Sequence, residues 1–585
     1  MNYNLNVEPK TTKRSIFAEL KELTKVAGNE RKNLVYALLL MLLNTFINLL
    51  GPFIIGYTID HYIATKQFDG VLLVAGLLLM LYTIVFNGSY WQTILMGGAA
   101  QRILFSMKNA VFKKIQQFPV AFFNQNKAGD LISRVNSDTE RLNQFFSQAL
   151  LQFVSSLFTL LAAGTFMLGL NFKLGVVTVL PAMVIWLFVN RISPWVRKKN
   201  AANLKSTGML SGEIQESLEN FKVVVAFNRR DYFRRRFDTT NGQNYKTAIG
   251  AGVANTVFMP VFSLFANVAQ LLVLIYGIYL IKNNSLTIGL LISFIAYANN
   301  FYNPIRQLAT LWTSFQTALA AWDRISNLLS LESNLTILPD TLTQTAPGLL
   351  AFSNVHFSYP NAKEVLHGIS FSLDAGKRYA FVGPTGGGKT TTASLMARLY
   401  DPSAGTIFFK GKDIRTYSDA ERAAQIGFIL QEPLLFSGTV MENILYGNEA
   451  YNLLETESVL KMIEEMGLTE LLSVFDQGLA TEVSAGGLQM SLGQKQLIAF
   501  MRAFLRKPSL LILDEATANV DTVTEQLLEK ILLRLPSFTT LVIIAHRLNT
   551  IENADEIFFV NAGQVERAGS FSDAVEKLMK EKRGS

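Results

Sequence analysis

The sequence of 585 residues contains no cysteine and only four histidines. The absence of thiols excludes a disulfide framework, a cysteine-ligated zinc site and thiol catalysis. Charged residues are also scarce at 17%, whereas hydrophobic residues reach 50% and the mean hydropathy is +0.25. This balance is too apolar for an ordinary soluble enzyme and predicts a membrane protein. The net charge of +8 is better explained by basic cytosolic loops than by nucleic acid binding, so we expect no nucleic acid partner.

Long apolar stretches fill the first half of the chain. Residues 1–32 precede them and lack the apolar core and small-residue cleavage site of a signal peptide, so we expect a cytosolic N-terminal segment. Most of the stretches exceed the roughly 20 residues that a helix needs to cross a bilayer. We therefore predict a six-helix transmembrane domain at 33–330, with spans near 34–59, 71–96, 145–170, 174–189, 252–281 and 287–312.

Basic residues indicate the orientation of these spans. The loops after the first, third and fifth spans carry only Lys66, Lys173 and Lys282, whereas the long segments after the second and fourth are rich in Lys and Arg. The positive-inside rule then places both termini and the two long segments in the cytosol, in a multi-pass protein of the cell membrane. We expect these segments to be helical extensions. Their turns, at 122–124 and 225–228, either dock on a cytosolic ATPase surface or pack as ordinary helix hairpins.

Ionised side chains inside a membrane usually mark an ion or proton relay. We expect all six spans to be free of Asp, Glu, Lys and Arg, and proton coupling is therefore disfavoured. Uncharged polar residues do occur in the spans, and they either line a cavity or hydrogen-bond a neighbouring helix. They are Asn44, Asn48, Ser155, Ser156, Asn267, Gln270, Asn299, Asn300 and Asn303.

A phosphate-binding loop lies in the second half of the chain. The eight residues from Gly383 to Thr390 read GPTGGGKT and match the full G-x-x-x-x-G-K-[ST] pattern, between a short strand at 378–382 and a helical pattern at 391–399. In this motif the backbone N–H groups surround a polyphosphate, Lys389 reaches the β- and γ-phosphates, and the Thr390 hydroxyl ligates Mg²⁺. The candidate ATP-binding residues are Gly383, Pro384, Thr385, Gly386, Gly387, Gly388, Lys389, Thr390 and Thr391.

An apolar strand that ends in two acids accompanies this loop. Residues 510–515 read LLILDE, and carboxylates at the tip of a buried strand mark the sheet edge where ligands bind. Asp514 is suited to hold Mg²⁺, and Glu515 to orient or deprotonate the attacking water. Further strand patterns alternate with helical ones, so we predict an α/β P-loop domain at 349–585 after a linker at 331–348.

These motifs resemble the nucleotide-binding domain of ATP-binding cassette (ABC) transporters, and nearly the whole chain resembles an exporter-type half-transporter, an ATPase coupled to transport. The resemblance implies ATP and Mg²⁺ as cofactors. It also implies that Tyr359 stacks on adenine, that Gln431 senses Mg²⁺ and the membrane domain, and that His546 contacts the γ-phosphate. The catalytic set would be Lys389, Gln431, Glu515 and His546, and the metal set Thr390, Gln431 and Asp514.

The family's LSGGQ signature is altered here. The chain has Met490-Ser491-Leu492-Gly493-Gln494, and its D-loop at 518–521 reads ANVD where SALD is usual. In the family, Ser491, Gly493 and Gln494 would face the ATP of a partner subunit. Because glycine permits a close approach and an unusual φ that leucine restricts, the site completed by Leu492 should hydrolyse poorly. The pattern resembles one subunit of a heterodimeric bacterial multidrug exporter.

The resemblance leads to three functional hypotheses. The first is ATP-driven export of hydrophobic or amphiphilic small molecules by alternating access, with a second half-transporter as partner. A homodimeric lipid flippase and an ATP-gated regulator or channel are the alternatives. Gly387, where many relatives have serine, lies at a variable position of the loop, and we expect that difference to be harmless.

Overall fold

The structure is a computed structural model that describes residues 3, 5, 28–332, 335, 337–339, 347–360, 362–448, 456–515, 521–545, 553–569 and 573. These residues pack into two compact units. One unit is helical, and its described residues are 28–114 and 129–330. The other contains residues 1–7, 115–128 and 331–585, which include the phosphate loop.

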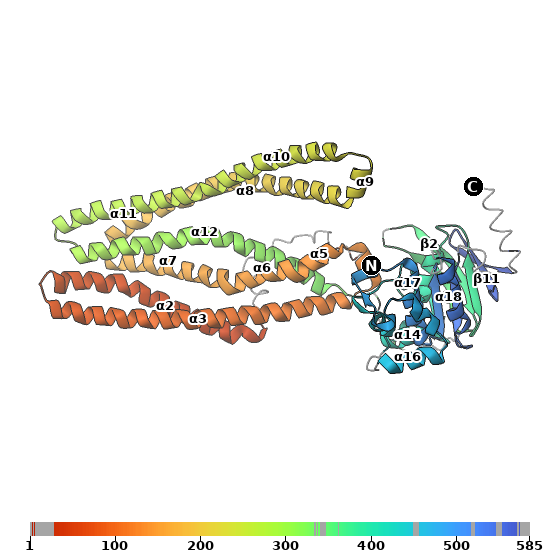
Figure 1. Ribbon diagram of the computed structural model, residues 1–585. Helices are drawn as coiled ribbons and strands as arrows, with labels where there is room; N and C mark the ends of the chain where they lie inside the picture. The colour runs from red at the N-terminus through yellow and green to blue at the C-terminus, as the bar shows by residue number, and fades with distance from the viewer. Residues whose placement is uncertain are drawn as a thin grey trace. The chain divides into compact units, whose positions relative to one another are not determined.

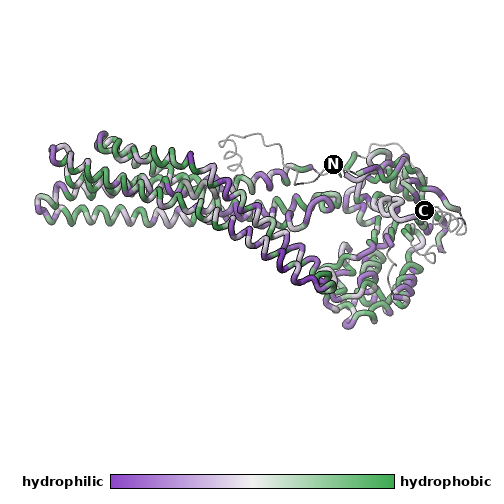
Figure 2. The backbone as a smooth tube through the Cα atoms, turned by 90° about the horizontal axis from the view of Figure 1, so that it is seen from above, coloured by the Kyte–Doolittle hydropathy of each residue, from purple (hydrophilic) through white to green (hydrophobic). Residues whose placement is uncertain are grey.

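Long helices form the first unit (Figure 1). Hydrophobic residues dominate the parts that correspond to the predicted spans (Figure 2). Inside the unit α12 packs against α7, α2 and α11, while α8 packs against α10 and α11. The elements are α2 (Arg31–Thr58), η2 (Ile59–Ile63), α3 (Phe68–Gln116), α5 (Ala128–Ser133), η3 (Arg134–Asp138), α6 (Thr139–Gln144), η4 (Phe145–Ala149), α7 (Leu150–Leu170), α8 (Phe172–Glu219), α9 (Phe221–Ala226), α10 (Arg230–Thr256), α11 (Phe258–Lys282) and α12 (Ile288–Ser330).

Five helical stretches in the described part of the chain are long and apolar enough to cross a bilayer: Arg31–Ile63, Phe68–Gln116, Ala128–Leu170, Phe172–Glu219 and Arg230–Lys282. The sixth predicted span lies in α12 and is not one of them. Its middle is less apolar because it contains Asn299, Asn300 and Asn303. The expectation of uncharged spans is also wrong for this stretch, since Arg306 lies within it.

Several of the polar residues in the spans hydrogen-bond a neighbouring helix, one of the two roles predicted for them. The Asn44 amide of α2 donates to Ser89 Oγ and Gln92 Oε1 of α3. Ser156 Oγ of α7 donates to Gln307 Oε1 of α12 at 3.0 Å. Such bonds satisfy polar atoms between membrane helices.

Close backbone contact joins the end of α2 to the start of α12. A Cβ atom on Gly56 would collide with the Gly289 carbonyl oxygen, and one on Gly289 with that of Gly56. Just beyond, Asp60 accepts hydrogen bonds from the Thr287 hydroxyl at 2.5 Å and from the Gly289 N–H at 2.8 Å. The carboxylate thereby satisfies a donor in the first turn of α12.

The second unit is an α/β fold with a parallel core. Its six-stranded sheet has the order β12-β11-β3-β10-β9-β6, and only the β11–β12 pair is antiparallel. A four-stranded antiparallel sheet, β2-β1-β4-β5, packs beside it. The strands are β1 (Leu350–Ser358), β2 (Glu364–Leu373), β3 (Arg378–Val382), β4 (Ala404–Phe409), β5 (Lys412–Asp413), β6 (Ile426–Ile429), β7 (Gly438–Thr439), β8 (Glu482–Val483), β9 (Leu510–Asp514), β10 (Thr540–Ile544), β11 (Glu556–Asn561) and β12 (Gln564–Gly569).

Short helices and 3-10 turns surround these sheets. They are α13 (Lys389–Met396), η5 (Ile414–Thr416), α14 (Asp419–Gln425), α15 (Val440–Leu445), α16 (Thr456–Glu465), η6 (Thr469–Val474), η7 (Gly478–Ala480), η8 (Ala485–Gly487), α17 (Leu492–Leu505) and α18 (Thr522–Leu533). Strand β9 is buried along its whole length, which explains why its sequence is continuously apolar up to Asp514.

The first of the two predicted turns, at 122–124, belongs to this unit and forms part of helix α4 (Val120–Gln125). Asn124 donates a hydrogen bond to the Tyr400 hydroxyl at 2.8 Å, and Phe122 is fully buried. This turn therefore docks on the ATPase fold, one of the two roles predicted for it. The second turn, in α9, lies in the other unit and exposes Phe221 and Phe227.

Candidate functional site

The phosphate loop connects β3 to α13 at the edge of the parallel sheet. Gly383, Gly386 and Gly388 have φ values of +147°, +84° and +112°. Residues other than glycine adopt these backbone conformations only with strain. Gly383 also lies so close to the Val560 carbonyl oxygen of β11 that a Cβ atom would collide with it. Two constraints, conformation and proximity, thus require glycine at the first position of the loop.

The space for a side chain at Gly387 is smaller than a variable position of the motif suggests. A Cβ atom there would lie 2.6 Å from the Val560 carbonyl oxygen and 3.2 Å from that of Pro384. Both neighbours are backbone atoms, so a serine at this position requires the loop to shift. The expectation that the exchange of serine for glycine is harmless is therefore wrong for this backbone, which has no room for a serine side chain at 387.

Lys389 is the first residue of α13 and its side chain is buried. Its Nζ donates to the carbonyl oxygens of Gly383 and Pro384, at 2.9 Å each. Burial lowers the pKa of Lys389 below its ordinary value, and the nearby carboxylates of Glu515 and Asp514 oppose that shift. The ammonium group therefore lies inside the loop, where the phosphates of a nucleotide would replace carbonyl oxygens as its partners.

Two polar pairs lie beside the loop. Thr390 Oγ1 donates to Asp514 Oδ1 at 3.3 Å, and Gln431 Nε2 donates to Glu515 Oε2 at 3.0 Å. Asp514 ends β9, and Glu515 follows it with φ +51°, a left-handed conformation that turns the chain at the sheet edge. The end of β9 thus lies beside both Thr390 and Gln431. Four residues predicted for the site, from three separate segments of the chain, therefore meet here.

Tyr359 lies at the end of β1, next to the loop helix. Its hydroxyl is 3.1 Å from Thr391 Oγ1, and its ring packs edge-on against Phe357 and Tyr400. The residue is partly exposed. It thus offers an aromatic surface beside the phosphate loop, as a base-stacking role requires.

The altered signature forms the N-terminus of α17. Ser491 is the N-cap, and its hydroxyl and backbone N–H exchange hydrogen bonds with Gln494, a capping box. Leu492 is the first residue of the helix, and its side chain is half-buried. Its φ is not in the left-handed region that favours glycine. The predicted restriction of an unusual φ by leucine at this position is therefore wrong. What remains of the prediction is the bulk of the leucine side chain at the N-terminus of α17.

Thr524 of α18 lies close to Gly493 of the signature and is hydrogen-bonded to Asp521. A Cβ atom on Gly493 would lie 2.8 Å from Thr524 Oγ1, while Asp521 caps α18 by accepting from the Thr524 N–H and hydroxyl. The other D-loop positions, Ala518, Asn519 and Val520, lie outside the described residues, as does His546.

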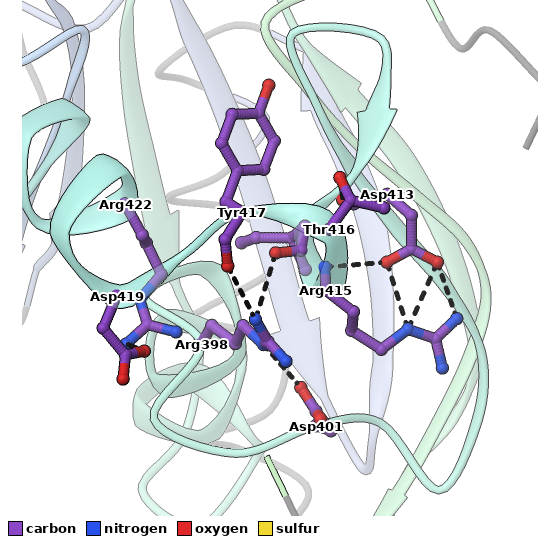
Figure 3. A network of polar contacts seen from close by, with 9 residues as sticks. Arg398, Asp401, Asp413, Arg415, Thr416, Tyr417, Asp419 and Arg422 are labelled. Atoms are coloured by element: carbon purple, nitrogen blue, oxygen red, sulfur yellow. Dashed lines mark hydrogen bonds and ion pairs between the residues drawn. The ribbon is translucent and has the colours of Figure 1, made fainter. Parts of the chain in front are cut away.

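Arg398 is a buried residue that the motifs did not reveal. It follows α13 with φ +50°, and its guanidinium binds Asp401 Oδ1 at 3.0 Å and the carbonyl oxygens of Ile414 and Tyr417 (Figure 3). These bonds tie the end of the loop helix to η5. Beside them lies a cavity of about 330 Å³ whose lining includes Tyr400, Asp401, Arg415 and Ala121 of α4.

Phosphate loop, acidic strand end and long apolar helices in one chain define a membrane protein with an ATPase domain. Two family models match accordingly: the ABC transporter transmembrane region at 34–305 and the ABC transporter domain at 366–518. The uncharacterized ABC transporter ATP-binding protein YfiC of Bacillus subtilis (strain 168) is 33% identical over 93% of this chain and 90% of its own. The chain therefore belongs to the ABC transporters, as an ATPase coupled to transport and a homologue of bacterial exporter half-transporters.

Two further comparisons agree with this assignment. A protein named as the fatty acid ABC transporter ATP-binding/permease protein of Mycobacterium bovis (strain ATCC BAA-935 / AF2122/97) is 31% identical over 82% of this chain and 76% of its own. The structure of a bacterial Atm1-family ABC exporter with ATP bound superposes with a TM-score of 0.76 at 25% identity. The superposition covers 94% of this chain and 96% of the exporter chain. The fold class predicted from the sequence is confirmed.

Proposed function

We propose that the chain exports hydrophobic or amphiphilic small molecules by ATP-driven alternating access, as one subunit of a heterodimer. The convergence of Lys389, Thr390, Asp514 and Glu515 at one sheet edge carries the proposal. The relative named for fatty acid transport supports an amphiphilic substrate. Cytosolic ATP would close the two ATPase domains, and hydrolysis would reset the transporter.

Each residue of the site has a chemical role in this proposal. Lys389 would exchange the loop carbonyls for the β- and γ-phosphates, and the loop N–H groups would bind phosphate oxygens. Glu515 would accept a hydrogen bond from the attacking water and remove its proton, while the Gln431 amide holds the carboxylate. Tyr359 would stack on the adenine base, and His546 is proposed for the γ-phosphate.

The residues around Asp514 also fit Mg²⁺. The Thr390 hydroxyl and the Asp514 carboxylate are adjacent oxygen donors, and Gln431 contributes an amide nearby. No cluster of three or more His, Asp or Glu suited to a metal occurs in the part of the chain that the structure describes. That is compatible with Mg²⁺, which proteins commonly hold by one or two carboxylates together with substrate phosphates. When bound, the ion would neutralise phosphate charge.

Leu492 supports the heterodimer. Two such ATPase domains would meet head to tail, with the signature helix N-terminus of one facing the phosphates bound by the other. A leucine side chain at the start of α17 would hinder that approach, whereas this chain's own Lys389 and Glu515 are intact. The partner subunit would then supply a regular signature, and the hydrolytic site would be the one built on this chain's phosphate loop.

Glu515→Gln is the direct test of the catalytic assignment. In the native pair we expect steady-state ATP hydrolysis to fall at least about a hundredfold, with ATP binding unchanged. Because glutamine keeps the size and one oxygen of the side chain, a loss of turnover reports on the carboxylate itself. Substantial residual turnover would remove Glu515 from its role.

Purification of the chain alone tests the pairing. If the heterodimer is correct, the isolated protein hydrolyses ATP poorly, and Leu492→Gly raises its activity by reopening the approach to the phosphates. Full ATPase activity of an isolated homodimer would instead favour the homodimeric flippase. Ion currents without substrate-stimulated hydrolysis would favour the ATP-gated channel.

A further inference from the structure

A polar stripe runs along α12, on the side that α7, α2 and α11 leave open. Its exposed residues recur at helical spacing, beginning with Ile288 and Ile292 and continuing with Asn299, Asn303, Arg306, Thr310 and Ser314. The stripe is apolar near the start of the helix and polar from Asn299 onward. One side of a membrane helix thus carries an amphipathic gradient along its length.

Helix α11 extends this surface. Gln270 Nε2 donates to Asn299 Oδ1 at 2.6 Å, and Gly277 lies against Leu291, which fixes the antiparallel register of α11 and α12. One and two helical turns beyond the Gln270–Asn299 pair, Asn267 is level with Asn303, and Ser263 with Arg306. All four are exposed. Exposed amides and hydroxyls of α11 therefore lie at the same heights along the helices as Asn303 and Arg306 of α12.

Arg306 and Asn303 have no hydrogen-bond or ion-pair partner among the residues that the structure describes. From Ile288 to Arg306 the helix rises about 27 Å, so Arg306 lies near one edge of a hydrocarbon core about 30 Å thick. Under the predicted orientation this is the cytosolic edge. A long arginine side chain at this depth can reach the membrane interface, and its donors, next to the Asn303 amide, are available to an acidic group there.

We infer that the patch defined by Ser263, Asn267, Gln270, Asn299, Asn303 and Arg306 binds the anionic headgroup of an amphiphilic transport substrate. A guanidinium pairs with an acidic group through two parallel N–H donors, and the amides supply further hydrogen bonds. The inference rests on the proposed export of amphiphiles and specifies the charge of the substrate and the residues that recognise it.

The apolar part of the same surface suits the tail of such a molecule. Toward the α11–α12 turn, α11 exposes Leu271, Leu274 and Ile278, and α12 exposes Ile288 and Ile292. A bound amphiphile would place its headgroup at Arg306 and its chain along these residues. Under the predicted orientation, this is how a lipid lies in the cytosolic leaflet.

Binding of one C16 chain with different headgroups tests the inference. The full chain, with its partner subunit where the two copurify, is placed in phosphatidylcholine nanodiscs at pH 8, and binding of radiolabelled palmitate, hexadecanol and hexadecylamine is measured. We expect palmitate to bind most tightly. Arg306→Gln should weaken palmitate binding at least about tenfold, the value of one charge-assisted hydrogen-bonded pair, and leave hexadecanol binding unchanged. Arg306→Lys should retain part of the preference.

Arg191→Gln is the matched control. Arg191 lies at a similar distance from the start of α8 and is also exposed, but its neighbours along the helix, Trp186 and Leu187, are exposed apolar residues. An equal loss of palmitate binding in both variants would mean a nonspecific effect of surface charge and overturn the inference. Unchanged palmitate binding in Arg306→Gln, with fewer dimers in native mass spectrometry, would assign Arg306 to the subunit interface and likewise overturn it.

Two further measurements separate this inference from the proposed function. If phosphatidylglycerol in the nanodisc displaces palmitate only when Arg306 is present, the headgroup chemistry is supported and a bilayer lipid is its source. If hexadecanol stimulates ATP hydrolysis and is transported as well as palmitate, with no effect of Arg306, amphiphile export stands and the headgroup site fails. If no amphiphile stimulates ATP hydrolysis, the proposed function itself fails.

Discussion

The Gln431 side-chain amide donates a hydrogen bond to Glu515 Oε2 at 3.0 Å. Gln431 follows β6, and Glu515 follows β9, its parallel neighbour in the sheet. The two side chains therefore leave the same sheet edge from adjacent strands. Since Gln431 is exposed, a movement of its loop would change the position of the proposed catalytic carboxylate.

Loss of this amide should slow hydrolysis without impairing nucleotide binding. We expect Gln431→Ala to lower kcat about tenfold, because one hydrogen bond to a charged group contributes roughly 1.5 kcal/mol or more. Glu432→Ala, at an exposed neighbour without a partner among the described residues, is the control. Steady-state kinetics with a separate measurement of ATP affinity check the result, and a change confined to ATP affinity would contradict it.

The lowered pKa of Lys389 predicts weaker ATP binding in alkaline solution. Only the protonated amine can pair with phosphates, and its burial lowers the lysine pKa below the ordinary 10.5. The dissociation constant for ATP should therefore begin to rise at a pH below that value, as the free protein loses this proton. Titration with a fluorescent ATP analogue from pH 8 to pH 10 measures the effect.

Lys389→Arg provides the control for this titration. A guanidinium stays protonated throughout that range, so the pH dependence should disappear in the variant even if its affinity at pH 8 is lower. An identical alkaline loss of affinity in both proteins would show that another group is responsible.

The phosphate loop and the acidic strand end could be predicted from the sequence because each motif encodes its own geometry. Lys389 and Asp514 are placed by a glycine-rich turn and by an apolar strand, both of which are local signals. Gly387 and Leu492 show where this fails. The space beside Gly387 is limited by Val560, far along the chain, and the helical φ at Leu492 follows from the Ser491 capping box.

The membrane unit was predictable in outline only. Hydropathy identifies the spans, but it averages over residues and therefore conceals single polar positions. The Asn299–Gln270 bond and the exposed Arg306 depend on the register of α11 against α12, which sequence periodicity does not give. The Gly56–Gly289 contact is likewise a property of two helices that are distant in the chain.

The hydrogen bonds of Asp60 should hold the start of α12 in place. We expect Asp60→Ala to free the Thr287 hydroxyl and the Gly289 N–H, at a cost of about 2 kcal/mol, and to accelerate amide hydrogen exchange at 287–291. Hydrogen–deuterium exchange with mass spectrometry measures this. Asp69→Ala is the control, because Asp69 is exposed in the first turn of α3 and has no partner in the described ranges. Unchanged exchange in Asp60→Ala would rule out this role.

The bond between Asn124 and Tyr400 should couple helix α4 to the ATPase fold. Tyr400→Phe removes the hydroxyl that accepts from Asn124 but keeps the edge-on packing against Phe357 and Tyr359. We expect basal ATP hydrolysis to persist while substrate stimulation falls up to about fivefold, since a neutral hydrogen bond contributes roughly 1 kcal/mol. Burial raises the pKa of Tyr400, so the effect should not vary with pH near neutrality. Asn124→Ala should give the same loss, and the double variant no further loss; additive losses would show that the two side chains act independently.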